Sequence, residues 1–256
     1  MRNRLSVRAR CALGWFAAFG FIFTAAELTR GDTIYSTTDP GGFLGFWGPD
    51  VFISQSVGVR FTPSGDYTFA TAGLWFMNND FEGNTHALVR VTLRTDDAST
   101  PGVSIPSNVI IEEMFLTVTT VGWDPVLETV VSTLHPRLCA GQHYWIVAES
   151  NVQAGVNGVW VMAGESTGFA ANTDQSQTNW QPGGMGAVPA TRVFGTPVVV
   201  GDVDGNGETN GLDVSRFVHA ALGAPVSPGD VGRADINCDE AVNQFDVTAF
   251  LDALLN

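Results

Sequence analysis

The feature of this sequence that most constrains its fold is a twelve-residue pattern of oxygen-bearing side chains that occurs twice, at residues 202–213 and 235–246. In each copy these side chains stand at positions one, three, five, nine and twelve. They are Asp202, Asp204, Asn206, Asn210 and Asp213 in the first copy, and Asp235, Asn237, Asp239, Asn243 and Asp246 in the second. A tight loop turns such alternate side chains towards one centre. The pattern therefore predicts two loops that each gather carboxylate and amide oxygens.

This spacing is that of an EF-hand-type calcium loop, because Ca²⁺ prefers six to eight oxygen ligands. Position seven offers its backbone carbonyl, which here belongs to Glu208 in the first loop and to Ala241 in the second. Position six makes a sharp turn that favours glycine. Gly207 supplies it in the first loop, whereas the second loop has Glu240. A non-glycine residue in that conformation costs about 1 kcal/mol. We therefore expect two calcium sites, the second one weaker.

Each loop is followed by apolar residues at the spacing of one helix face. They are Val214, Phe217, Val218, Ala221 and Leu222 after the first loop, and Val247, Phe250, Leu251, Leu254 and Leu255 after the second. We expect both stripes to be buried against each other. No entering helix is expected, since strand-like residues 197–200 precede the first loop and residues 229–233 precede the second.

A duplicated loop and helix without an entering helix resembles a dockerin domain, and the resemblance covers about residues 200–256. It implies a small α-helical domain that needs calcium to fold and then docks onto a cohesin-type partner. In that family, positions ten and eleven of each loop help to select the cohesin. These positions are Gly211, Leu212, Gln244 and Phe245 here, not the common Ser-Thr pair. The identity of the partner stays open, and the alternative is calcium binding without a cohesin.

Residues 1–26 have the basic, apolar and small-residue order of a secretory signal peptide. An uncleaved membrane anchor is the alternative. We expect the mature chain to have no membrane span and to be secreted, extracellular or associated with the cell surface. The formal net charge of −14 disfavours nucleic acid as a partner, because the chain would repel phosphates.

Residues 27–197 are predicted to form an antiparallel β-sandwich or jelly roll, and residues 198–256 a second, dockerin-like domain. Residues 87–94 alternate, with Ala87, Val89, Val91 and Leu93 on one face, which is typical of a half-buried strand. Six further strands are predicted at residues 51–61, 67–77, 109–120, 125–134, 143–149 and 158–162. Turn residues separate these runs.

Three segments of this region resemble a β-sandwich module of bacterial exported and surface proteins. They are Phe61–Pro63 leading to residues 74–79, then residues 91–96 with Pro101 and Gly102, and finally residues 138–147. The resemblance implies a fold and a location, and it carries no activity.

No HExxH or P-loop pattern occurs in the sequence. Glu112 and Glu113 are adjacent, so they point to opposite faces of a strand and do not form an acid–base pair. We therefore expect a non-catalytic protein whose sandwich binds or presents a ligand. The alternative is a glycoside hydrolase for polysaccharide breakdown that its dockerin delivers.

Carbohydrate binding needs exposed aromatic rings beside polar groups. The candidates lie in predicted loops and are Phe46, Trp47, Trp123 and Trp180. For each of them the alternative is packing over an end of the sandwich. Trp75, Trp145 and Trp160 lie in predicted strands, and we expect them in the core.

Two cysteines, Cys139 and Cys238, lie outside the predicted signal peptide, and each falls in a different predicted domain. The expectation is therefore two isolated thiols, with a disulfide between them as the alternative.

Overall fold

The computed structural model describes residues 31–41, 47–83, 86–97, 99–173 and 179–255. The predicted signal peptide and Phe46 lie outside these residues. Residues Gly31–Asn256 form one compact unit. Among the described residues, no helix combines the length and the apolar character that crossing a membrane requires.

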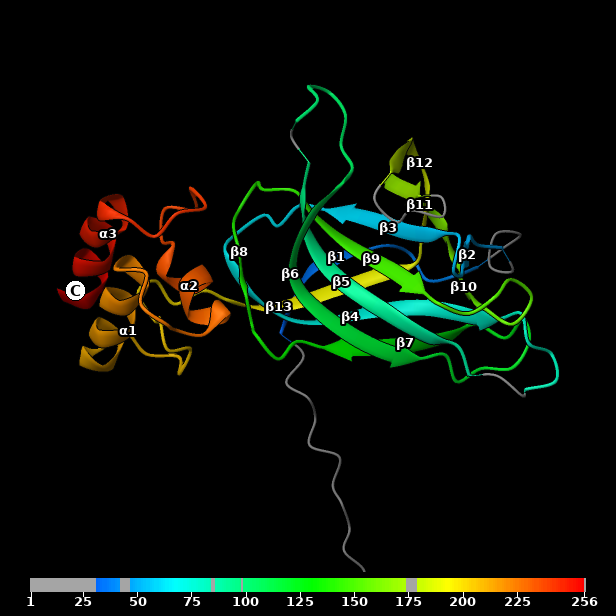
Figure 1. The fold of residues 1–256 in the computed structure, drawn as a ribbon, viewed down its shortest axis with the longest axis horizontal. Helices are drawn as coiled ribbons and strands as arrows, with labels where there is room; N and C mark the ends of the chain where they lie inside the picture. The colour runs from blue at the N-terminus through cyan, green and yellow to red at the C-terminus, as the bar shows by residue number, and fades with distance from the viewer. Residues whose placement is uncertain (1–30, 42–46, 84–85, 98, 174–178, 256) are drawn as a thin grey trace, which may run out of the picture. The chain divides into compact units, whose positions relative to one another are not determined.

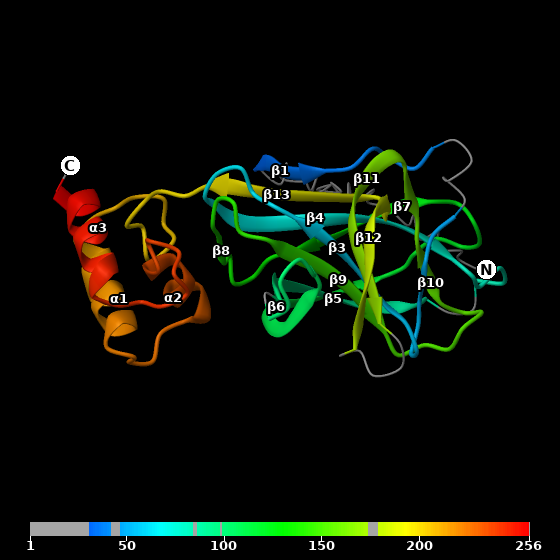
Figure 2. The same cartoon turned by 90° about the horizontal axis from the view of Figure 1, so that it is seen from above.

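Two antiparallel sheets form the predicted sandwich (Figures 1 and 2). The first sheet runs in the order β1 (Asp32–Ser36), β13 (Thr191–Pro197), β4 (Tyr67–Asn78), β10 (Gly158–Trp160) and β2 (Asp50–Val51), with β7 (Val126–Val131) and β8 (Arg137–Leu138) also paired to β4. The second sheet runs β12 (Trp180–Pro189), β11 (Met162–Thr173), β3 (Ser56–Phe61), β9 (Tyr144–Ser150), β5 (Leu88–Asp96) and β6 (Pro106–Thr117). The mainly β fold and its antiparallel pairing are as predicted.

The inward face predicted for β5 is confirmed, because Val89, Val91 and Leu93 are fully buried in the core between the sheets. The strand is not half-buried as predicted, since Thr92 and Arg94 on the other face are buried as well. Glu112 and Glu113 point to opposite faces of β6, as predicted. Glu112 is buried and accepts hydrogen bonds from the Ser132 hydroxyl and the Leu134 N–H, whereas Glu113 is exposed and pairs with Arg90.

The interpretation of Trp180 as an exposed loop residue is wrong. Trp180 begins β12, is only 5% exposed and packs with Trp145 and Val147 in a second, smaller apolar cluster. The Arg94 guanidinium lies 5.8 Å from its ring centre. The outer face of the second sheet is thus partly covered, which a simple alternation of inward and outward residues does not predict.

Five strands, namely β1, β8, β11, β12 and β13, were not predicted from the sequence. Most of them are rich in small residues and lack a regular apolar alternation, so their pairing depends on neighbouring strands. The run predicted at residues 51–61 divides into β2 and β3, because the backbones of Phe52 and Gln55 bond to each other in a tight turn.

Three helices follow the sandwich in the sequence, namely α1 (Gly211–Ala221), α2 (Pro228–Ala234) and α3 (Gln244–Leu255). Helices α1 and α3 follow the two loops as predicted. Helix α2 leads directly into the second loop, which corrects the expectation that no helix enters it. Its start has a local cause, because the Ser227 side chain caps the Asp230 N–H at 3.1 Å and Pro228 occupies the first turn.

The helices share a small core in which the rings of Phe217 and Phe250 stack with centres 4.2 Å apart. Val203, Ala234 and Ile236 complete this cluster with Ala220. The expectation that each whole apolar stripe is buried is wrong, because Val218 and Leu251 are exposed.

Candidate metal sites and their surroundings

The first loop brings three of its predicted ligands together. Asp202, Asp204 and Asp213 each place a carboxylate oxygen within 4.8 Å of the others. Asp213 is fully buried and accepts the N–H groups of Val203 at 2.7 Å and Asp204 at 3.0 Å. Asp202 accepts the Gly207 N–H at 2.8 Å. These backbone donors orient the carboxylates towards one centre.

The second loop also gathers three carboxylates, but from positions one, five and twelve, whereas the first loop uses positions one, three and twelve. Asp235, Asp239 and Asp246 form this second carboxylate cluster. Asp246 is fully buried and accepts the Ile236 N–H at 2.8 Å and the Asn237 N–H at 3.0 Å. The two loops therefore share the geometry of the position-twelve carboxylate and not only one sequence pattern.

The asparagines at position nine join each loop to the helix that follows. The Asn210 side chain caps α1 by accepting the Leu212 N–H at 2.9 Å, and Asn243 accepts the Phe245 N–H at 2.8 Å. Asp213 completes a capping box with Asn210. Each loop is thereby hydrogen-bonded to the first turn of its helix.

The remaining predicted ligands also lie in the loops. At position five, Asn206 accepts the Glu208 N–H at 2.8 Å. At position three of the second loop, Asn237 accepts the Asp239 N–H at 3.0 Å. The side chains of Glu208 and Ala241 are exposed, so the ligand atom that we predict at position seven is the backbone carbonyl.

The charge of these clusters fits a divalent cation. A buried carboxylate is costly without a countercharge, and among the described residues neither Asp213 nor Asp246 forms an ion pair. Burial raises the pKa of Asp235, and the nearby carboxylates of Asp246 and Asp239 raise it further. A set of only oxygen donors suits a hard cation such as Ca²⁺.

The two loops differ in backbone strain. Gly205 and Gly207 take positive φ angles of 77° and 92° in the first loop. The equivalent residues of the second loop are Cys238 and Glu240, with φ angles of 60° and 69°. Each non-glycine residue in this region costs roughly 1–2 kcal/mol. The second loop therefore carries strain at two positions, four and six.

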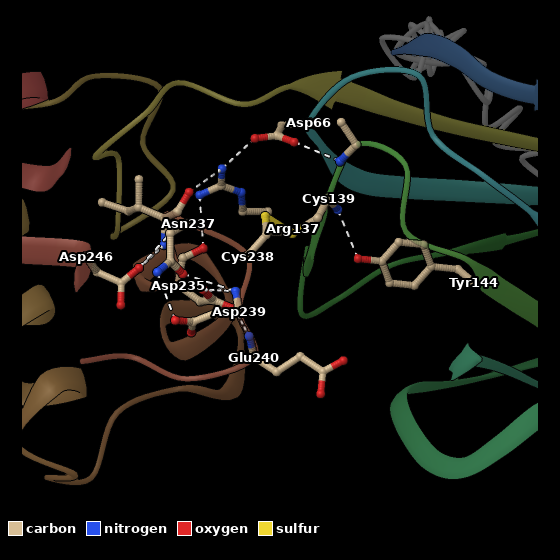
Figure 3. Close-up of a disulfide and its surroundings, with 12 residues drawn as sticks. Asp66, Arg137, Cys139, Tyr144, Asp235, Asn237, Cys238, Asp239, Glu240 and Asp246 are labelled. Carbon is tan, nitrogen blue, oxygen red and sulfur yellow. Dashed lines mark hydrogen bonds and ion pairs between the residues drawn. A yellow bond between two sulfur atoms is a disulfide. The ribbon is translucent and has the colours of Figure 1, made fainter. Parts of the chain in front are cut away.

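Cys139 and Cys238 form a disulfide with Cα atoms 6.0 Å apart, which corrects the expectation of two isolated thiols (Figure 3). The pairing joins the segment after β8 to position four of the second loop. The sequence assigns the two cysteines to separate domains, and this pairing depends on contacts between distant segments that no local pattern predicts. The two cysteines lie where α2 and the second loop approach the segment 134–139.

Arg137 is a residue of this site that sequence reasoning missed. Its buried guanidinium donates to the backbone carbonyls of Asp235 and Ile236, both at 3.1 Å, and pairs with Asp66 at 2.5 Å (Figure 3). Burial opposes ionisation of Asp66, but the Ala140 N–H and Arg137 outweigh it and lower the pKa of that carboxyl. No local pattern marks Arg137, because its partners lie far along the chain.

An apolar row lies exposed on α1 and is repeated on α3 at equivalent positions with matching exposure. The pairs are Leu212 and Phe245 (67% and 66%), Val214 and Val247 (36% and 38%), Val218 and Leu251 (44% and 46%), and Leu222 and Leu255 (77% and 80%). We call these eight residues the paired apolar rows. Two of them, Leu212 and Phe245, are residues that the sequence predicted to select a partner, whereas Gly211 and Gln244 begin the two helices.

Two of the predicted aromatic ligand residues of the sandwich are exposed. Trp47 is 66% exposed and Trp123 is 56% exposed. Trp123 packs edge-on against Phe81, an exposed ring that sequence reasoning missed, with ring centres 5.4 Å apart.

Residues 200–255 match the family model of the dockerin type I domain. Dockerin domains bind calcium, and the two carboxylate clusters lie within the matched residues. The sandwich lies outside the match. None of the curated proteins matches the chain.

Proposed function

We propose that this chain is an exported protein whose C-terminal domain, residues 198–256, binds two Ca²⁺ ions and docks onto a cohesin-type partner. The β-sandwich of residues 27–197 then binds or presents a ligand at the cell surface. No reaction is assigned to the sandwich.

The observation that carries the docking proposal is the set of paired apolar rows. Isolated exposed apolar residues are ordinary, but contiguous ones mark interaction sites. Here the exposure of each residue on α1 is reproduced on α3. A stripe that only stabilised the fold would be buried along its whole length, whereas Phe217 and Phe250 already fill the core.

Calcium has a direct part in this proposal. The six carboxylates of Asp202, Asp204, Asp213, Asp235, Asp239 and Asp246, together with Asn206, Asn210, Asn237 and Asn243, would supply side-chain ligands. When bound, the ion neutralises the carboxylate clusters. Asn210 and Asn243 also cap α1 and α3. A loop in its calcium-binding conformation therefore positions the paired apolar rows for docking.

Export is supported by the basic and apolar order of residues 1–26 and by the Cys139–Cys238 disulfide. Disulfides persist in oxidising compartments outside the cytosol. The proposal therefore places the mature chain in the extracellular space or at the cell surface.

The docking proposal is tested by passing the full chain over a panel of immobilised cohesin domains in Ca²⁺ and in chelator. We expect at least one cohesin to retain the chain in Ca²⁺ only. Val218→Asp and Leu251→Asp should abolish that retention, whereas Val109→Asp, at an exposed valine of β6, should not. Retention by no cohesin would overturn docking.

For the sandwich, the exposed Phe81–Trp123 pair supports a carbohydrate ligand, since apolar faces of sugar rings pack on such rings. A glycan array with the full chain tests this. Trp123→Ala should remove glycan binding. Phe115→Ala, which changes an exposed ring elsewhere, on β6, should leave glycan binding unchanged. Binding to no glycan would exclude this ligand class.

A further inference from the structure

We propose that the β-sandwich is a structural part of the second calcium site: Arg137 and the Cys139–Cys238 disulfide position the second loop for Ca²⁺, so that its affinity depends on the redox state of the disulfide. This inference rests on the proposed calcium binding. It assigns positioning roles to residues outside the matched domain.

The disulfide acts on the loop itself. Cys238 lies between Asn237 and Asp239, two predicted ligands, and holds a positive φ of 60°. Its partner, Cys139, directly follows β8 and donates its N–H to the Tyr144 hydroxyl at 2.9 Å (Figure 3). The bond thus ties a strained residue in the middle of the ligand set to an anchored part of the sandwich.

Arg137 fixes the start of the same loop. Its two Nη atoms donate to the carbonyls at positions one and two, those of Asp235 and Ile236. The peptide groups held in this way precede Asn237, and the Asp235 carboxylate accepts the Glu240 N–H at 2.9 Å. Asp66 in turn holds the guanidinium from the sandwich side.

The first loop has its own internal support. Arg233 of α2 donates from Nε to the Val203 carbonyl at 2.9 Å, which is position two of the first loop. Arg233 precedes the second loop, and the residue at the corresponding place before the first loop is Val200, whose side chain has no hydrogen-bond donor. The repeat therefore supplies no equivalent arginine to the second loop, and Arg137 occupies that role from the sandwich.

The backbone around this junction is closely packed. A Cβ on Gly229 of α2 would lie 2.3 Å from the Leu134 carbonyl oxygen, so only glycine fits there. Arg233 also donates to the His135 carbonyl at 3.3 Å. The segment 134–139 therefore contacts both the helix that enters the second loop and the loop itself.

A loop that is held in its binding shape loses less conformational freedom on binding an ion. Residues that orient metal ligands typically change metal affinity by about 10- to 100-fold when they are removed. We expect a loss in that range at the second loop for Cys139→Ser, and no change at the first loop. Arg137→Met should lower the Ca²⁺ affinity of the second loop similarly. Arg137→Lys, which keeps a single charged donor nitrogen, should lower that affinity less.

The experiment is a Ca²⁺ titration of the full chain followed by the amide resonances of Gly207 and Glu240. Each amide bonds to the position-one carboxylate of its own loop, so each reports one site. Arg192→Met is the matched control, because Arg192 pairs with Asp39 on the sandwich. An unchanged second-loop affinity in Cys139→Ser and Arg137→Met, or an equal loss at both loops, would overturn the inference.

The reciprocal measurement needs no variant. A dithiol reductant passes two electrons and two protons to the disulfide, which leaves two thiols and the cyclic disulfide of the reductant. If the disulfide strengthens the second site, Ca²⁺ must make the disulfide harder to reduce by the same factor. Thiol trapping at a series of reductant concentrations, with and without Ca²⁺, gives that factor, and a factor of one contradicts the inference.

The two proposals fail separately. If neither the Gly207 nor the Glu240 resonance responds to Ca²⁺, the proposed calcium binding itself is wrong. If both respond with affinities that Cys139→Ser and Arg137→Met leave unchanged, calcium binding stands and only the contribution of the sandwich is rejected.

Discussion

At the scale of single residues, the two calcium loops differ where the backbone takes positive φ. Glycine pays no Cβ penalty there, whereas Cys238 and Glu240 do. The duplicated sequence pattern hides this difference because the ligand positions are the same in both loops. The asymmetry arises at positions four and six, which contribute no side-chain ligand.

Replacing Glu240 by glycine should stabilise the second loop. The strain energy that is relieved at this left-handed position exceeds the entropic cost of ordering glycine. We therefore expect the free energy of unfolding to rise by about 0.5–1 kcal/mol. Chemical denaturation in Ca²⁺ measures it. The control is Gly207→Ala, where an added Cβ meets no atom within 4 Å. It should destabilise the first loop through backbone strain alone. The prediction fails if the two substitutions change the free energy of unfolding in the same direction.

At the scale of elements, the apolar stripe of each helix serves two purposes. Phe217 and Phe250 stack in the core, whereas Val218 and Leu251, their neighbours in the sequence, lie exposed. The helical spacing alone predicted one buried face. It did not separate the two groups, because both lie on adjacent parts of the same helix surface.

Substitutions in the stripe should therefore have separable effects. Phe217→Ala removes a buried ring and should destabilise the fold by roughly 3–5 kcal/mol. Leu222→Ala, on a residue that is 77% exposed, should change the free energy of unfolding by less than about 0.5 kcal/mol and should weaken docking. Thermal unfolding and cohesin retention measure the two effects. An equal loss of stability in both variants would contradict this division.

Helix α2 is tied to α1 by a buried carboxylate. Asp230 pairs with Arg216 at 2.6 Å and with Arg233 at 2.7 Å. Burial would raise the pKa of Asp230, but Arg216, Ser227 and Arg233 outweigh it and lower the pKa. A lowered pKa in the folded protein means that the ionised form stabilises the fold.

This stabilisation should be complete above the ordinary Asp pKa of about 3.9 and should be lost as the pH falls through the lower, folded value. The measurement is the melting temperature of the helical domain in the native chain and in Asp230→Asn, at one saturating Ca²⁺ concentration, from pH 7 to pH 3. The difference between them should shrink only below about pH 4. A constant difference over the whole range would show that the charge of Asp230 contributes nothing.

At the scale of the whole molecule, the sandwich and the helices depend on calcium to different extents. The sandwich has fully buried tryptophans both in its core, Trp160, and in its smaller apolar cluster, Trp145, and has no carboxylate cluster of this kind among its described residues. The helical part has a small core and two charged clusters, so its stability depends on their neutralisation.

Removal of Ca²⁺ by a chelator should therefore reduce the far-ultraviolet helical signal of α1 and α3 and leave the near-ultraviolet signal of the buried tryptophans intact. Return of the helical signal on addition of Ca²⁺, but not of Mg²⁺, completes the test, because Mg²⁺ demands a tighter octahedral shell. A simultaneous loss of both signals would contradict this separation.

The amino-acid sequence by itself determined the two loops, the helices that follow them and the β-rich class of the larger region, because spacing and alternation are local properties of the chain. The predicted positions of Asp213 and Asp246 fall at buried centres for the same reason. Only the tertiary structure decided the Cys139–Cys238 bond, the hold of Arg137 on the second loop, the burial of Trp180 and the division of the helical stripes. Each depends on segments far apart in the chain, and their approach is set by the packing of the whole molecule.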